Sequence, residues 1–533
     1  MAAVAAPTPM EGVSKARWLI LIGLILAAIM EVLDTTIVNV SLPQMAGNLG
    51  ATSEEIGWVS TGYILSNVIV LPLTAWLASR YGRKNYLGFS ILLFVAASFF
   101  CGTSGSLGAL VFWRIVQGAG GAALLSTAQA TLREIFPPEQ QGLVQSIYVL
   151  GIIVAPTLGP TVGGWITDNY SWHWNFLINL PIGVLAFFLV YTFLQDSKFT
   201  MNVKSVDWVG IALLAVGLGC LQYLLEEGNA KAWFDSPAIV YPFIVSAITL
   251  PLFIWWELRP QNLTPVVNLR VLKNRDLSAG LTLFLVLGFG LYGGVFLYPM
   301  FAQNVMHLTP TETGLALLPG GIATGIAAIT CGRLMNGANA KKIDPRWLIL
   351  TGLSLYTFAM ITLGLLPSTA GMDNTQTALL LRGLGLGLLF VPINLAAFAS
   401  LKGAEIAQGA GLINLCRQLG GSLGIAILGS FVTNRMAVGR AGLVDNAFAG
   451  NPALEQRVSA ATHALMAKGY SMPAAKQAAY SLVDRAVATE ASTIAFNSGF
   501  LMIAGVTILS LPIILVLRKP KPTAAPAAPV DAH

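Results

Sequence analysis

Charged side chains are scarce in this sequence. Asp, Glu, Lys and Arg make up 10% of its 533 residues, and 55% of the residues are hydrophobic. An ordinary soluble domain carries about 25% charged residues, so this composition excludes a soluble globular protein. Apolar runs of about 20 residues recur from end to end, and each is long enough to cross a bilayer as a helix. We therefore expect an all-α integral membrane protein.

Cysteine and histidine are also rare, with four of each. The cysteines lie singly in or at the ends of apolar runs, and the histidines are scattered, so we predict neither a disulfide framework nor a metal site. The sequence contains no P-loop, HExxH or GxSxG motif, which excludes ATP as a fuel within this chain. We predict a protein that is not an enzyme and needs no cofactor. A membrane-embedded lipid enzyme stays as a much weaker alternative.

The apolar runs predict fourteen membrane spans. Their approximate limits are Trp18–Pro43, Ile56–Ala78, Tyr86–Cys101, Leu107–Ala130, Gly142–Ile166, Trp172–Leu194, Val209–Leu225, Ala238–Trp256, Leu277–Phe301, Gly314–Leu334, Trp347–Leu366, Thr377–Ala399, Ala404–Val432 and Ala495–Leu517.

The distribution of basic residues predicts the topology. The net charge is +6, which by itself would suit a nucleic-acid partner. If the N-terminus is cytoplasmic and the connections alternate sides, however, nearly all Lys and Arg of the short loops fall inside, and the short outside loops hold only Lys231. This is the positive-inside pattern of a multi-pass membrane protein. We therefore expect both termini in the cytoplasm and no nucleic-acid partner.

The chain repeats itself at an offset of about 268 residues. Arg114 precedes a group of closely spaced glycines, and Arg382 precedes a similar group. Two six-span halves with two extra spans between them are typical of a transporter, with a binding site at midplane between the halves. The expected units are a disordered N-terminus (1–17), an N-terminal bundle (18–196), an insert with its flanking loops (197–276), a C-terminal bundle (277–517) with an extracytoplasmic helical loop (435–494), and a disordered tail (518–533).

The helical loop allows two interpretations. Ser471 is placed to cap a helix whose apolar stripe would include Ala475, Ala479, Leu482 and Ala486. The segment is then either a packed cap outside the membrane or a docking surface for a partner.

Two carboxylates lie inside the first span, Glu31 and Asp34. Ionisable groups within a membrane are costly and mark functional sites by default, and a low dielectric disfavours the charged form of a carboxyl, which can then exchange a proton. Asp34 sits about 24 Å along the span at 1.5 Å per residue, where a cavity open to the outside could reach it. Arg114 stays charged at any relevant pH, so its partner must be an anion or backbone carbonyls. We predict proton coupling at Asp34, Glu31 and Arg114, with a structural role as the alternative.

Several other intramembrane side chains could line a substrate cavity. Polar groups could equally form hydrogen bonds between helices, and aromatic groups could face lipid. The candidates are Asn39, Gln117, Tyr292, Phe296, Asn394, Asn414 and Gln418. Arg382 and Arg417 are further intramembrane arginines whose role, structural or functional, stays open.

The fifth span carries small residues at every fourth position, from Gly151 through Ala155 and Gly159 to Gly163. That spacing puts them on one helix face, where another helix can approach closely. We expect this face to pack the two halves together. Pro156 and Pro160 lie in the same span and favour a bend.

These motifs resemble those of the major facilitator superfamily, and in particular the fourteen-span drug:proton antiporters of the EmrB type. The resemblance covers essentially the whole chain. The first span matches the family's intramembrane Asp motif, with Ser41 where Ala is usual. The remaining matches are Leu110, Arg114, Gln117, Gly118, Gly120 and Gly121 in span four, the antiporter motif Gly151, Pro156, Gly159, Pro160, Gly163 and Gly164 in span five, and Trp172, Trp174, Phe176, Asn179, Pro181 and Gly183 at the start of span six.

The resemblance implies a major facilitator fold with fourteen transmembrane helices, as two six-helix bundles plus a two-helix insert. It further implies multidrug efflux, and with it antibiotic resistance, by alternating access: small hydrophobic or amphipathic compounds leave the cell in exchange for protons. Export of one dedicated compound, such as a fatty acid, siderophore or antibiotic, remains the alternative. The implied location is the inner membrane, surrounded by lipid, and the implied partners are a periplasmic adaptor protein and a TolC-type outer-membrane duct.

The loop after the second span departs from the family pattern. It keeps the basic residues of the cytoplasmic gating loop, with Ser79 where the family has an acid. The retained residues are Arg80, Gly82, Arg83 and Lys84. We therefore expect a salt bridge from the Ser79 position to be missing.

Overall fold

A computed structural model describes residues 16–196, 206–262, 265–335, 343–445 and 451–517. Those residues form helices joined by short connections and contain no strand. The N-terminus and tail predicted to be disordered lie outside the described residues, except that Arg17 already begins the first helix. Helices suit the bilayer core, where no water is available to the backbone, because a helix satisfies its backbone hydrogen bonds internally.

The helices follow the predicted spans closely. In the first part of the chain they are α1 (Arg17–Ile37), α2 (Leu42–Leu49), α3 (Ser53–Val70), α4 (Thr74–Tyr81), α5 (Arg83–Gly102), α6 (Leu107–Ile135), α7 (Gln141–Asn169), α8 (Trp174–Leu177) and α9 (Asn179–Phe193). The insert consists of α10 (Trp208–Glu227) and α11 (Pro237–Leu258). The last part holds α12 (Arg275–Asn304), α13 (Pro310–Leu334), α14 (Pro345–Leu363), α15 (Met372–Phe398), α16 (Ala404–Asp445), α17 (Pro452–Ala467) and α18 (Met472–Ser510).

Thirteen helical stretches of the described residues are long and apolar enough to cross a membrane. α7 is 29 residues long and occupies the predicted fifth span, which accounts for the remaining one. Two of the helix starts carry a capping box, from Thr52 to Glu55 at α3 and from Thr309 to Glu312 at α13. Both helices therefore begin at a residue that the local sequence specifies.

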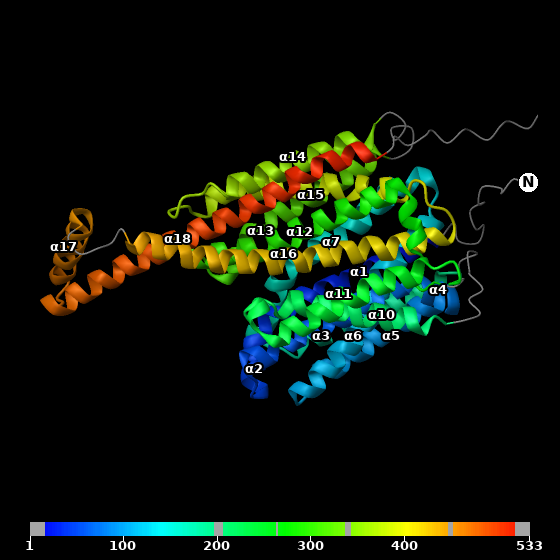
Figure 1. Ribbon diagram of the computed structural model, residues 1–533, viewed down its shortest axis with the longest axis horizontal. Coiled ribbons are helices and arrows are strands. Elements are labelled where there is room, and N and C mark those ends of the chain that lie inside the picture. Colours follow the sequence, from blue (N-terminus) through cyan, green and yellow to red (C-terminus); the bar gives the residue numbers. More distant parts are fainter. Residues whose placement is uncertain (1–15, 197–205, 263–264, 336–342, 446–450, 518–533) are drawn as a thin grey trace, which may run out of the picture.

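Two separate hydrophobic cores organise the molecule. One is built from residues between Ile20 and Leu194, and the other mainly from residues between Leu277 and Leu517. Around the first core, α1 packs against α6, α7 and α9; around the second, α12 packs against α15, α16 and α18. Figure 1 shows these two groups of roughly parallel helices lying side by side.

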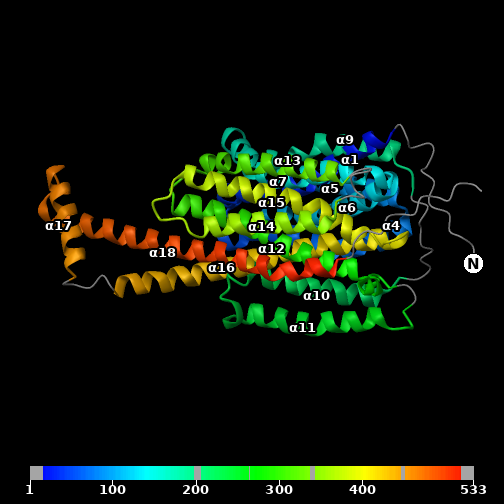
Figure 2. The same ribbon diagram turned by 90° about the horizontal axis from the view of Figure 1, so that it is seen from above.

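The insert contacts both groups. α10 and α11 run next to each other along one edge of the molecule (Figure 2), and α10 packs on α3 from one group and on α16 from the other. Thr61 of α3 donates a hydrogen bond to Glu227, and Gln222 donates one to Ser422 of α16 over 2.7 Å. The insert therefore bridges the two bundles.

Two helices, α16 and α18, extend well past the rest of the bundle, and α17 lies at their tip (Figure 1). We call the projecting parts of α16 and α18, together with α17, the hairpin. α16 runs on to Asp445 and α18 already begins at Met472, so both helices continue into the segment that was expected to be a helical loop (435–494). We call this side of the molecule the hairpin end, and the side where α1 begins the terminal end.

The predicted apolar stripe of the hairpin was only half right. Ala475 and Ala479 are buried where α17 packs against α18, but Leu482 is 48% exposed and Ala486 is exposed too. The stripe ends there because α17 is a short helix of 16 residues and covers only the first turns of α18.

Candidate functional site

The carboxylate of Asp34 lies at the centre of a buried polar network. Its Oδ1 accepts hydrogen bonds from Gln117 Nε2 at 3.0 Å and from Asn179 Nδ2 at 3.1 Å, and its Oδ2 is ion-paired with Arg114 Nη1. Asp34 is fully buried, and Arg114 is 1% exposed. Two helices, α6 and α9, thus aim donors and a positive charge at one carboxylate of α1.

Arg114 is held in place on every side. Its Nε donates to the carbonyl of Val59 at 2.8 Å and its Nη1 to Gln117 Oε1 at 2.8 Å. The guanidinium also lies 4.3 Å from the ring centroid of Tyr63, a cation–π contact. Both expected kinds of partner for Arg114, an anion and a backbone carbonyl, are therefore present in the structure, and the anion is Asp34.

Glu31 lies on the same helix but belongs to different surroundings. Its Oε1 accepts one hydrogen bond, from Asn67 Nδ2 at 3.3 Å, and its Oε2 has no partner among the described residues. The residue is 4% exposed. Asp34 is thus held by three donors and Glu31 by one.

The small residues of α7 pack against α1 rather than between the two bundles. A Cβ atom at Gly159 would lie 2.0 Å from Thr36 Oγ1, and one at Gly163 would lie 2.6 Å from the carbonyl oxygen of Ile37. Gly151 faces Ile25 and Ile29 in the same way. The expectation that this face joins the halves was wrong, because its partner is the helix that carries Asp34. Pro160 falls among the side chains that the structure leaves undescribed.

The two bundles meet closely at the terminal end. A Cβ atom at Gly142 of α7 would lie 2.5 Å from the carbonyl oxygen of Gly332 of α13. On the other side of the interface, Asn414 Nδ2 of α16 donates to Gln129 Oε1 of α6 at 3.1 Å, and both side chains are buried. No side chain larger than hydrogen fits between α7 and α13 at Gly142, so the bundles are closed together here.

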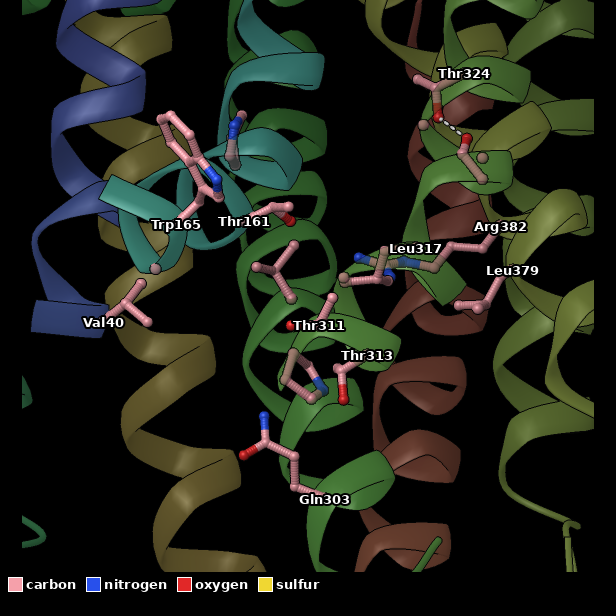
Figure 3. Close-up of a pocket in the computed structure, with 18 of the residues that line it drawn as sticks. Val40, Thr161, Trp165, Gln303, Thr311, Thr313, Leu317, Thr324, Leu379 and Arg382 are labelled. Carbon is pink, nitrogen blue, oxygen red and sulfur yellow. Dashed lines mark hydrogen bonds between the residues drawn. The ribbon is translucent and has the colours of Figure 1, made fainter. Parts of the chain in front are cut away.

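A cavity of about 560 Å³ lies between the bundles towards the hairpin end. α7 lines it from the first bundle, and α12, α13 and α15 line it from the second (Figure 3). Trp165, Asp168 and Asn169 at its edge are exposed, so it opens at the hairpin end. Asp34 does not line this cavity, and the expected contact between the two is absent in this conformation, in which the carboxylate is sealed.

The candidate cavity residues lie elsewhere. Asn39 is exposed near the end of α1 and accepts a hydrogen bond from Ser60, Gln117 belongs to the Asp34 network, and Tyr292 accepts one from Arg417 at 2.5 Å. Asn394 is buried, and neither side-chain atom has a partner among the described residues. Phe296 and Gln418 are partly buried. None of these lines the 560 Å³ cavity, whereas Pro156 and Gly164 of the antiporter motif do.

The gating loop is anchored by acids other than the one missing at position 79. Arg83 is ion-paired with Glu134 at the end of α6, and Asp196 accepts a hydrogen bond from the backbone N–H of Lys84 at 2.8 Å. Gly82 has a φ of +85°, a conformation that favours glycine, and a Cβ there would lie 2.9 Å from Asp196 Oδ1. The guanidinium of Arg80 lies 5.7 Å from the Trp76 ring. Within the part of the chain that the structure describes, the Ser79 hydroxyl donates only to its own helix, to the carbonyl of Ala75 at 2.8 Å.

Two participants were not identified from the sequence alone. Asn179 appeared only as part of a motif at the start of span six, and its bond to Asp34 becomes visible once α9 is packed on α1. Arg382 was left open as structural or functional, and the structure places it in the cavity wall.

Comparison with known proteins gives a consistent result. The family model described as Major Facilitator Superfamily matches residues 24–425. The chain is 35% identical over 447 residues to the multidrug export protein EmrB of Haemophilus influenzae, covering 83% of this chain and 86% of that protein. It is 35% identical over 433 residues to the fatty acid resistance protein FarB of Neisseria gonorrhoeae, covering 81% and 83%. Among solved structures, the proton:xylose symporter XylE aligns with a TM-score of 0.59 at 13% identity, covering 94% of this chain and 96% of that one.

Proposed function

The chain belongs to the Major Facilitator Superfamily, and we propose that it is a proton-coupled exporter of hydrophobic or amphipathic compounds that needs no cofactor. The observation that carries the proposal is the fully buried carboxylate of Asp34, fixed inside a membrane span by Arg114, Gln117 and Asn179. The names of the EmrB relatives support drugs as the cargo.

The geometry supports alternating access. The bundles are closed at the terminal end and enclose a cavity that opens at the hairpin end. If the termini are cytoplasmic, as the basic residues of the loops predict, this conformation faces outward and has its cytoplasmic side shut. The protein would then lie in the inner membrane. The adaptor and outer-membrane duct remain part of the proposal, with the projecting hairpin outside the membrane as the segment available to them.

Protonation of Asp34 is the proposed coupling step. A proton on the carboxyl removes the charge that holds Arg114, so the bonds between α1 and α6 weaken. α1 also packs against the glycine face of α7. Two other residues of α7, Pro156 and Gly164, line the cavity. A change at Asp34 is therefore transmitted to the cavity wall through one helix contact. One proton crossing about 150 mV supplies about 3.5 kcal/mol, enough for a gradient of a few hundred-fold.

Export of a single dedicated compound is the second candidate function. The FarB relative carries fatty acid resistance in its name, so export of a fatty acid by this chain is the specific form of that alternative.

The test uses purified protein in liposomes with an imposed pH gradient, ethidium and decanoate as separate cargoes, and a trapped pH dye. Asp34→Asn is expected to abolish uphill accumulation and the accompanying proton flux while leaving exchange of cargo at equilibrium intact. The matched control is Asp235→Asn, which neutralises an exposed carboxylate in the connection between α10 and α11. Uphill transport by Asp34→Asn at the wild-type rate would overturn the proposal. Accumulation of decanoate alone would favour the dedicated exporter.

A further inference from the structure

Arg382 is a buried arginine in the wall of the cavity. It lies on α15, and its residue is 6% exposed. Among the described residues, its Nε has no hydrogen-bond partner and no carboxylate forms an ion pair with it. Figure 3 shows the side chain reaching from α15 towards Leu317 of α13, another residue of the cavity wall. The cavity therefore contains a fixed positive charge without a protein anion beside it.

The corresponding residue of the first bundle is different. Arg114 occupies the equivalent place in the internal repeat, yet it is paired with Asp34 and does not line the cavity. Two neutral tyrosines lie near Arg382: Tyr356, whose hydroxyl donates to the carbonyl of Gly290 at 2.6 Å, and Tyr298. Two similar arginines are thus used differently, one inside a closed ion pair and one facing the cavity.

The backbone leaves room for the guanidinium. A Cβ atom at Gly294 of α12 would lie 3.2 Å from Arg382 Nη2 and 3.4 Å from its Cζ. A side chain at that position would crowd the charged group, so glycine lets α12 pass close to the guanidinium without displacing it. A carboxylate would bind in the plane of the guanidinium, at its N–H edge, through two parallel hydrogen bonds.

The rest of the cavity is suited to an apolar group. Leu291, Val295, Leu317, Leu379 and Leu386 line it around Arg382. A second hollow of about 350 Å³ between α7 and α13 is almost wholly apolar and shares Gly321 with the cavity. The one acidic residue of the lining, Asp168, is exposed at the edge.

We propose that Arg382 is an anion subsite and that the cavity takes amphipathic small molecules with a carboxylate or similar acidic head group, which binds the guanidinium while the apolar tail packs against the leucine-rich wall. This inference rests on the proposed export function and specifies its substrate class. The ligand enters from the hairpin end, where the cavity opens.

The test measures equilibrium binding without any gradient, so it does not depend on coupled export. The full chain is placed in phosphatidylcholine nanodiscs and titrated with decanoate, decanamide and decylamine, which share one tail and differ in head-group charge. Wild type is expected to bind decanoate most tightly. Arg382→Gln should weaken decanoate by about ten-fold or more, because a charge-assisted bond is lost, and leave decanamide within about two-fold. Arg382→Lys keeps the charge and should restore part of the affinity.

A matched control is Arg440→Gln, which removes an exposed arginine of the projecting hairpin and should leave all three affinities unchanged. Equal weakening of decanoate and decanamide by Arg382→Gln, or no change in either, overturns the subsite. If Arg382→Gln does not fold, Gly294→Ala carries the test: crowding the guanidinium should weaken decanoate selectively, and an unchanged preference overturns the proposal.

A last arm separates a soluble cargo from a lipid. Discs containing phosphatidylglycerol should leave decanoate binding unchanged, whereas competition by this lipid would assign the subsite to a lipid head group and overturn the proposed cargo. Failure of export with intact decanoate binding would remove the proposed function and leave the subsite in place. Export of ethidium by the wild type, with decanoate binding unaffected by Arg382→Gln, would keep the proposed function and remove the subsite.

Discussion

Asn179 Nδ2, on α9, donates a hydrogen bond over 3.1 Å to Oδ1 of Asp34, on α1, across 145 positions of sequence. Both side chains are buried, at 1% and 0% exposure. The bond ties the helix that follows the antiporter motif to the carboxylate proposed to carry the proton, and it makes Asn179 a positioning residue for that step.

We expect Asn179→Ala to slow proton-driven export by about ten-fold and to shift the pH dependence of its rate, because the carboxylate loses one donor to its charged form. The measurement is the initial rate of uphill transport in liposomes between pH 5.5 and 8.5. Asn175→Ala is the control: Asn175 is also buried, but it donates to Thr167 at 2.9 Å and does not contact Asp34. A loss of rate with an unchanged pH profile, equal in the two variants, would reduce Asn179 to a packing residue.

Glu31 should matter less than Asp34. Glu31→Gln keeps the acceptor for Asn67 and removes only a charge that has one hydrogen-bond donor. We expect it to retain uphill export within about three-fold of wild type, because it breaks no ion pair. The same liposome assay compares it with Asp34→Asn. If Glu31→Gln is inactive while Asp34→Asn pumps normally, Glu31 is the coupling carboxylate.

Two glycines of α7 offer a matched pair. Gly159→Ala places a methyl group 2.0 Å from Thr36 Oγ1, whereas Gly164→Ala places one 3.9 Å from Val40, an ordinary contact. Overpacking of this kind costs about 1–3 kcal/mol. We expect Gly159→Ala to lower the melting temperature in detergent and to uncouple or stop export, and Gly164→Ala to stay close to wild type in both. Similar behaviour of the two variants would show that contact with α1 is unimportant.

Topology can be tested by labelling single cysteines with a membrane-impermeant maleimide. Ala230→Cys and Thr369→Cys are exposed in hairpin-end connections and should react from outside, whereas Asn85→Cys and Lys402→Cys are exposed at the terminal end and should react only in inverted vesicles. Outside labelling at Asn85 would reverse the predicted orientation.

Much of the helical architecture could be predicted from the sequence, because membrane spans are read from composition and length alone. α16 and α18 continue past their apolar runs into the segment expected to be a helical loop. Helical sequence predicts the helix there, whereas the apolar run alone predicts the membrane span. A buried guanidinium was expected to bind an anion or backbone carbonyls, and Arg114 contacts both, Asp34 and the carbonyl of Val59.

The cavity could not be predicted, for a physical reason. Polar residues in a span signal either a cavity or a contact between helices, and only the packing decides between them. Asn414 turned out to bond Gln129 across the closed interface, whereas Thr324 and Gln303, which carried no sequence signal, line the cavity. Likewise, the glycine face of α7 could be predicted from the sequence, but the helix that packs against it could not.

The 42 residues of α16 form one uninterrupted helix. Its first turns contact α4 and α6 of the opposite bundle at the closed end, and its last turns lie in the projecting hairpin. At 1.5 Å per residue the helix is about 63 Å long. If the bundles separate at the terminal end and α16 moves as a rigid body, the far end of α16 would be displaced further than its first turns. The position of the projecting helices would then differ between the two states of the transporter.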